Sequence, residues 1–196
     1  MYLYYLFLIT YFIGSYRNIK KDAAILGKDY VVKIWDKVRN TLIVNLGIIS
    51  PLFFYNIRDY IDYTGLNGQF WYLFLIFLIN WVLYDIITYF VHRVFHMRRF
   101  YNLHRKSHEI SNRIGLYYNS PIDFVLMHLL PLYFGLVIFR AHILLYIYFT
   151  VLETIYKMGR MNRDIGIFHR RVGNCNFGSD LFMDKLMGTL HRRKME

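Results

Sequence analysis

The sequence predicts an all-α integral membrane protein with two membrane helical hairpins and a cytoplasmic helical region that carries a histidine cluster. Three observations support this fold class. Of the 196 residues, 56% are hydrophobic and 19% are charged, whereas a soluble domain is about half apolar and a quarter charged. The apolar residues gather in runs that are long enough to form membrane helices. The formal net charge of +11 is concentrated between those runs.

The strongest apolar run covers residues 70–91 and contains one charged residue, Asp85. A helix of about 20 apolar residues crosses the ~30 Å hydrocarbon core of a bilayer, so this run predicts a membrane span. A preceding run, 41–57, is predicted to pair with it as the first hairpin. A longer run, 122–156, is predicted to form two short helices with a turn at 140–142, which would make the second hairpin.

The basic residues predict how the hairpins are oriented. Of the 24 Lys and Arg residues, all but Arg58 and Arg140 lie in segments 17–39, 92–120 and 157–196. Because basic loops stay on the cytoplasmic side of a membrane, two hairpins place all three segments on that side. Anionic lipid head groups then account for the positive charge, and no nucleic acid partner is required. The last four residues, 193–196, loosely resemble a dibasic endoplasmic-reticulum retrieval signal, so the endoplasmic reticulum or another internal membrane is the expected location.

Residues 1–40 are predicted to form an N-terminal region that precedes a membrane domain at 41–196. The first 16 residues are apolar and rich in aromatic side chains, which suits a fifth helix, an interfacial anchor or a signal-like segment. We expect this stretch to be retained, since it lacks a basic start and an obvious cleavage site. Segment 17–39 interleaves lysines with apolar residues, which predicts a helix lying on the membrane surface. Those apolar residues are Leu26, Tyr30, Val31, Ile34 and Trp35.

Five histidines in the basic segments form a candidate metal-binding set: His92, His96, His104, His108 and His169. The first four form two pairs, and the members of each pair lie four residues apart, on one face of a helix. Imidazole suits iron, zinc and copper, and a chain with a single cysteine, Cys175, has no cysteine-rich site. Iron or zinc is therefore expected. The alternative is that the pairs are structural, because the neighbouring arginines oppose a bound cation.

Asp85 and Tyr89 lie on the same helical stripe as His92, since the three positions are spaced by four and three residues. A carboxylate inside a membrane helix is costly and indicates a functional role by default. Asp85 is predicted to accept a hydrogen bond from a metal-binding imidazole, with Tyr89 beside it. The alternative is that Asp85 pairs with a nearby arginine.

Several strings of residues resemble the fatty acid hydroxylase/sterol desaturase superfamily, in the order in which that family has them. They are DxxxYxxHRxxH at 85–96, LHRKSHE at 103–109, SPID at 120–123, NCNFG at 174–178 and DKLMGT at 184–189. The resemblance implies a membrane enzyme with two membrane hairpins and a cytoplasmic histidine cluster that holds two irons. It further implies activation of dioxygen with electrons from a partner such as cytochrome b5, and a lipid or sterol substrate.

The chain departs from this family pattern at three positions. Ser107 stands where the second box has its middle histidine, Lys157 stands near an expected histidine, and His169 is what remains of the third box. The five histidines would then be an incomplete iron set, in a lipid hydroxylase or desaturase. The alternatives are a catalytically inactive scaffold or lipid-binding protein and, least favoured, a bis-histidine haem protein. Three further side chains could replace missing ligands, namely Glu109, Asp164 and His191.

Overall fold

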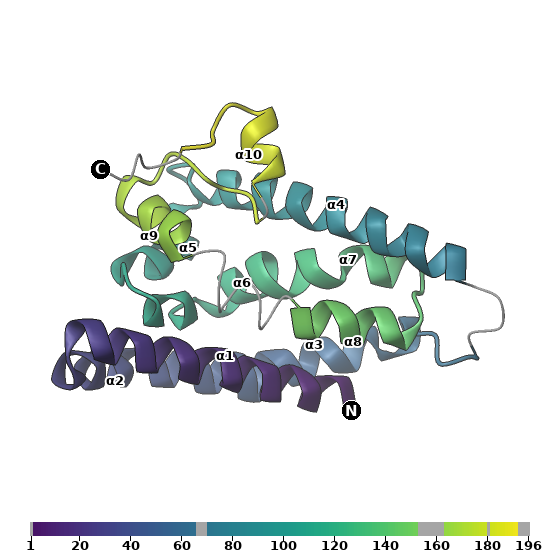
Figure 1. The fold of residues 1–196 in the computed structure, drawn as a ribbon, viewed down its shortest axis with the longest axis horizontal. Helices are drawn as coiled ribbons and strands as arrows, with labels where there is room; N and C mark the ends of the chain where they lie inside the picture. Colours follow the sequence, from purple (N-terminus) through teal and green to yellow (C-terminus); the bar gives the residue numbers. More distant parts are fainter. Residues whose placement is uncertain (1, 66–69, 153–162, 180, 192–196) are drawn as a thin grey trace.

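The apolar runs of the sequence become helices in the computed structural model, which describes residues 2–65, 70–152, 163–179 and 181–191 (Figure 1). In chain order the helices are α1 (Tyr2–Leu26), α2 (Lys28–Val44), η1 (Asn45–Ile49), α3 (Ser50–Ile57), η2 (Arg58–Tyr60), α4 (Phe70–Phe95), α5 (Tyr101–Glu109), η3 (Ile114–Tyr117), α6 (Pro121–Phe124), η4 (Val125–Leu129), α7 (Leu130–Ile138), α8 (Ile143–Leu152), α9 (Arg163–Val172) and α10 (Phe182–Leu186). The described residues contain no strand, so the prediction of an all-α fold is confirmed for them.

Three helical stretches are long and apolar enough to cross a bilayer: Lys28–Tyr60, Phe70–Phe95 and Pro121–Ile138. The first and third run through a proline, at Pro51 and Pro131, and each contains a π-helix just before it. Proline cannot donate the regular backbone hydrogen bond and its ring crowds the preceding turn, and the wider π-helix relieves this crowding. The prolines therefore do not end these stretches. Length and composition support a membrane protein.

The turns of the two predicted hairpins meet at one end of the molecule. The backbone of Asp62 accepts a hydrogen bond from the N–H of Ile143 and donates one to the carbonyl of Ala141. The imidazole of His142 is 2.8 Å from the carbonyl oxygen of Thr64. Helices α5 and α9 lie at the opposite end (Figure 1). The turn predicted at 140–142 is confirmed, since α7 ends just before it and α8 begins just after it.

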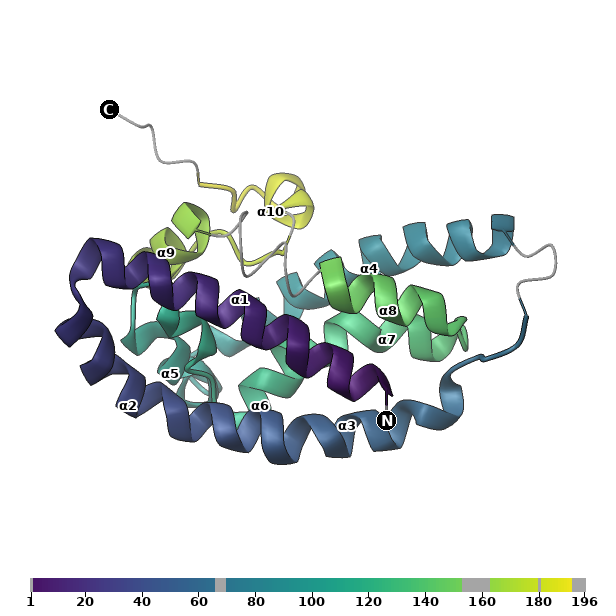
Figure 2. The ribbon, with the colours of Figure 1, turned by 60° about the horizontal axis from the view of Figure 1, so that its bottom comes forward.

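Segment 17–39 is not the single surface helix that its pattern predicts. Gly27, with a φ of +88°, separates α1 from α2, and α2 folds back beside α1 (Figure 2). A positive φ is accessible to glycine without strain, so the chain turns there. Val31 and Ile34 are buried against other helices, whereas Tyr30 is exposed. Alternating lysine and apolar residues predict a half-buried helix correctly, but here the apolar side packs on protein.

Buried polar contacts fix α1 to the segment that follows α5. The carboxylate of Asp22 is buried, accepts a hydrogen bond from the backbone N–H of Ile114 at 2.9 Å, and pairs with the guanidinium of Arg113 at 3.1 Å. The amide of Asn18 donates to the hydroxyl of Tyr117 at 2.8 Å. Helix α1 is thus an integral part of the fold.

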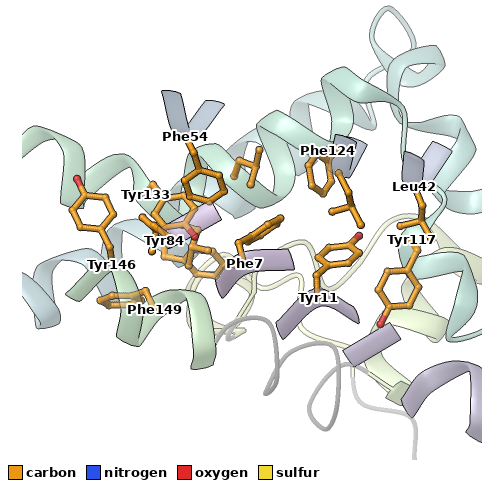
Figure 3. Packing of buried hydrophobic residues seen from close by; sticks show 14 of the residues in the cluster. Phe7, Tyr11, Leu42, Phe54, Tyr84, Tyr117, Phe124, Tyr133, Tyr146 and Phe149 are labelled. Atoms are coloured by element: carbon orange, nitrogen blue, oxygen red, sulfur yellow. The ribbon is translucent and has the colours of Figure 1, made fainter. Parts of the chain in front are cut away.

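Aromatic rings form much of the core (Figure 3). Phe7 of α1 packs on Phe54 of α3, with ring centroids 5.4 Å apart, and Phe54 packs on Tyr133 of α7 at 5.5 Å. Tyr133 in turn stacks on Tyr146 of α8 at 5.9 Å. These residues belong to one buried cluster, so the predicted N-terminal region shares its core with the predicted membrane domain.

Helices α4 and α7 approach closely at Gly135. A Cβ atom at this position would lie 2.5 Å from the amide oxygen of Asn80 and 3.2 Å from a methyl of Leu83. Asn80 is fully buried, and its amide donates to the carbonyl of Leu132 at 3.3 Å. The asparagine therefore has little freedom to move aside, and the absence of a side chain at Gly135 allows the two helices to pack.

We expect Gly135→Ala to destabilise the protein by about 1–3 kcal/mol, the usual effect of adding a methyl group to a well-packed core. The matched control is Gly47→Ala, because a Cβ at this other helical glycine meets nothing within 4 Å. The measurement is the thermal unfolding midpoint of each variant in the same detergent. Equal midpoints for the two variants would contradict this account of the α4–α7 contact.

Candidate metal centre

The five predicted histidines converge at one point. His92 lies in the last turn of α4 and His96 follows that helix, His104 and His108 lie on α5, and His169 lies on α9. Each offers a ring nitrogen, and these five atoms all lie within 4.8 Å of one another. Two of the helices are more than 50 residues apart in sequence, so the cluster depends on the tertiary fold.

Four of the five rings direct their Nδ1 atoms away from the cluster. The Nδ1 of His92 lies 2.9 Å from the carbonyl oxygen of Phe177, and that of His104 lies 2.8 Å from the carboxylate of Asp123. The Nδ1 atoms of His108 and His169 face the carbonyls of Arg170 and Cys175. Carbonyl and carboxylate oxygens only accept hydrogen bonds, so each Nδ1 carries the proton. In a neutral ring, Nε2 then carries a lone pair.

Four of the Nε2 atoms lack a proton donor among the described residues, and that of His104 lies 3.2 Å from the hydroxyl of Ser107, which also bonds to the carbonyl of His104. The Nε2 atoms of His92 and His104 lie 3.1 Å apart, although both rings already use their Nδ1–H outward. The Nε2 atoms of His96, His108 and His169 are buried with no hydrogen-bond partner. Buried polar atoms are nearly always satisfied, and a metal cation is a partner that several lone pairs can share. The described residues therefore form a group that could hold a metal ion.

Burial keeps the histidines outside the membrane stretches uncharged at neutral pH. Burial first, and then the neighbouring imidazoles, lower the pKa of His96 to about 3, that of His108 to about 4 and that of His169 to about 3. A ligating imidazole must be neutral, so these rings are available for a metal at pH 7.

The arginines near the cluster are engaged elsewhere. Arg93 donates to the hydroxyl of Tyr89 at 2.9 Å, and Arg113 pairs with Asp22. The guanidinium of Arg170 donates to two backbone carbonyls, of Ile110 and Asn112. Of these three, Arg113 is paired with a carboxylate, whereas Arg93 and Arg170 bond to neutral groups, and the charge of Arg170 also lowers the pKa of His108.

The segment after α9 covers the cluster. The ring of Phe177 packs edge-on against His92, His96 and His169, with centroids 5.3–5.5 Å apart. The carboxylate of Asp184 accepts hydrogen bonds from the backbone N–H groups of Phe177 and Gly178, at 2.7 and 2.6 Å. This carboxylate sets the shape of the loop whose carbonyls orient two of the histidines.

Asp85 acts on the histidines through this loop. Its buried carboxylate accepts hydrogen bonds from the hydroxyl of Ser179 at 3.0 Å and the backbone N–H of Met183 at 2.8 Å. The direct bond that we predicted from His92 to Asp85 is replaced by the bond from His92 to the carbonyl of Phe177. The carbonyl of Phe177 is therefore the hydrogen-bond acceptor for His92, a role that the helical spacing had assigned to the carboxylate of Asp85.

Tyr89, predicted beside Asp85, is fully buried and packs edge-on against Phe177 at 5.9 Å. Its hydroxyl lies 3.4 Å from that of Thr189. Tyr89 therefore also holds the C-terminal segment against α4. Its position next to the cluster was predictable from the helical stripe, but its partner in the C-terminal segment was not.

Asp123 is the site residue that sequence reasoning missed. It lies in α6, where Ser120 caps the helix by accepting a hydrogen bond from the N–H of Asp123 at 3.2 Å. The cap places the carboxylate opposite the Nδ1 of His104. The string Ser-Pro-x-Asp is a recognisable helix start, and an acidic residue there could have been considered as a histidine partner.

Of the other candidate positions, Ser107 touches the ring of His104, two are exposed, and two lie outside the described side chains. Glu109 is exposed and faces Arg105 at 3.8 Å, and His191 is exposed and stacks on Phe168 at 4.8 Å. Ser107 is buried, and its hydroxyl donates to the carbonyl of His104 at 2.8 Å. Two side chains, Lys157 and Asp164, lie outside those that the structure describes.

Comparison of the chain with family models, curated proteins and solved structures finds no match. The function is therefore argued from the chemistry of this site. The site offers five imidazoles, of which four have a defined tautomer, and a loop that covers them.

The metal-free protein should lose stability as the pH falls from about 6.5 towards 4. The folded-state pKa values of His96, His108 and His169 lie below the ordinary value of 6.5, so the unfolded chain binds protons that the folded chain does not. The thermal midpoint of the chelator-treated protein, measured from pH 7.5 to 4.5, tests this. His96→Gln should flatten the profile, and His191→Gln should leave it unchanged. A wild-type profile as flat as that of His96→Gln would contradict the prediction.

Asp184→Asn should weaken metal binding about 10- to 100-fold, the usual effect of disturbing groups that orient metal ligands. The asparagine amide would place its own N–H donor opposite one of the two backbone N–H groups whose hydrogen bonds the carboxylate now accepts. The measurement is a cobalt(II) titration followed by visible absorption. Glu109→Gln is the control, because this exposed acid lies beside the centre without orienting it. Binding by Asp184→Asn as tight as by the wild type would show that the loop does not position the ligands.

Proposed function

We propose that this chain is a membrane-bound, iron-dependent oxidoreductase that hydroxylates or desaturates a lipid or sterol. The observation that carries the proposal is the set of five imidazoles, three buried and two half-buried, whose ring nitrogens converge at the end of an apolar helix. The resemblance of the residue strings to the fatty acid hydroxylase/sterol desaturase superfamily supports iron as the metal. Bound iron would supply dioxygen activation, with electrons from a donor such as cytochrome b5.

The number and spacing of the donors favour one metal ion over the two irons that the resemblance implies. Nitrogen ligands lie about 2.1 Å from a metal such as zinc, so opposite ligands of one ion are about 4.2 Å apart. The five donors span 4.8 Å, close to this value. Two ions about 3.5–4 Å apart would spread their ligands over a longer distance. Ser107, in a family ligand position, offers a hydroxyl that already bonds within α5.

The residues around the centre suit a reaction that must exclude water. Phe177 covers one side of the cluster, and the loop 174–178 keeps His92 and His169 in the tautomer that ligates. The apolar surface of α4 leads to His92, so a membrane lipid held along this helix would approach the metal from the bilayer. We propose that the cluster lies on the cytoplasmic side of an internal membrane. The reason is that the basic segments lie at the same end of the helices as the cluster.

Metal content and lipid composition test this function together. After expression in iron-rich medium and purification in detergent, we expect about one iron per chain, changed cellular lipids and no haem absorption band. The double variant His92→Ala/His96→Ala should lose both the iron and the lipid change, whereas His191→Gln should keep both. Trace iron with unchanged lipids would overturn the proposal. A biological effect that survives in the double variant at full expression would identify an inactive scaffold instead.

A further inference from the structure

A groove lies between α1 on one side and α2 with η1 on the other. It is away from the histidines. Its volume is about 310 Å³, at the lower end of the range of small-molecule sites. The lining from α1 is Tyr4, Leu8 and Phe12, and the lining from α2 and η1 is Trp35, Arg39, Leu42, Ile43, Leu46 and Gly47. All of these residues except Arg39 present largely apolar surface, so the groove suits a hydrocarbon chain.

The inner end of the groove is shaped by two residues. The hydroxyl of Tyr4 donates to the carbonyl of Leu46 at 3.0 Å, which joins α1 to the π-helix there. Gly47 leaves space beside this contact, because a Cβ at this position would meet nothing within 4 Å. π-helices are frequent at functional sites. The exposed residues Ile9 and Ile48 nearby are apolar, so this end belongs to the hydrophobic part of the molecule.

Arg39 and Trp35 lie towards the other end of the lining, nearer along α2 to the turn at Gly27. The guanidinium of Arg39 is 54% exposed, and the carboxylate of Asp36, 3.9 Å away, is 66% exposed. Such an exposed pair contributes little stability, so a phosphate can displace Asp36. Arginine binds phosphate oxygens through two parallel hydrogen bonds. Trp35, in the same lining, is a residue type that favours the head-group region of a bilayer.

We propose that this groove binds one anionic phospholipid, with an acyl chain between α1 and α2 and its phosphate at Arg39. Along α2 the lining runs from apolar residues to Arg39 and then to Trp35, so the cation and the tryptophan lie together at one end, where the head group of such a lipid would be. None of the five histidines lines the groove, so this site is separate from the metal centre. The bound lipid would hold the two N-terminal helices together.

Quenching of Trp35 fluorescence by brominated lipids tests this site. In a Trp71→Phe/Trp81→Phe background, Trp35 is the remaining tryptophan of the chain. We expect saturable quenching by brominated phosphatidylserine, with at least a threefold preference over brominated phosphatidylcholine. Arg39→Gln should abolish this preference, and Gly47→Leu should reduce quenching by both lipids by filling the groove. Lys37→Gln, which removes an exposed neighbouring cation outside the lining, should change neither.

Equal quenching by the two lipids, or a preference that persists in Arg39→Gln, would overturn the proposal and indicate an ordinary lipid annulus. Tighter competition by a brominated fatty acid than by phosphatidylserine would identify a single-chain acid as the ligand instead. Quenching that disappears as the chain dimerises would show that a second copy covers the groove. Arg39→Gln is a surface change, so the test remains decisive if Gly47→Leu fails to fold.

Discussion

The outward hydrogen bond from the Nδ1 of four of the five histidines is the interaction on which the centre depends. A neutral imidazole has one donor and one acceptor nitrogen. Once the Nδ1 atoms of His92 and His104 donate to Phe177 and Asp123, their Nε2 atoms face each other as acceptors. Each buried unsatisfied polar group costs about 1–3 kcal/mol, so several together are a substantial burden for a fold of this size. A shared cation would remove this burden, which is why the geometry indicates a ligand set and not an ordinary polar core.

The acceptors of these bonds explain why the chain maintains polar groups in apolar surroundings. Two of them are carbonyls of a loop that Asp184 shapes through two backbone N–H groups. Asp85 then holds the end of this loop and the start of α10 against the long apolar helix α4. A buried carboxylate in such a helix is expensive, and here it is satisfied by hydrogen bonds from Ser179 and Met183. Two layers of hydrogen bonds thus satisfy the buried polar groups. The histidines donate to carbonyls of the loop, and N–H groups of the loop donate to the carboxylates.

Sequence reasoning succeeded where a periodic signal exists. The apolar helix over 70–91, the turn at 140–142 and the two histidine pairs follow from apolar run length and from the four-residue helical spacing. The orienting carbonyls of Cys175 and Phe177 were beyond reach, because a backbone carbonyl carries no mark in the sequence. The break of segment 17–39 at Gly27 was not predicted, and its position on the membrane surface stays a prediction, because a helix packed on protein and one packed on lipid show the same alternation. The role of Asp85 was assigned directly to an imidazole, since spacing along one helix says nothing about a loop nearly 100 residues later.

The N-terminal helices and the metal centre are mechanically connected. η3 contacts α1, α2 and α5, and the buried pair of Asp22 with Arg113 anchors α1 next to it. Helix α5 carries His104 and His108, so the position of α1 constrains two of the five ligands. Groups that share partners in one packed network do not respond independently to change. A lipid between α1 and α2 would therefore brace the helix pair that supports α5, and the groove and the centre, though separate in their residues, would be coupled through η3.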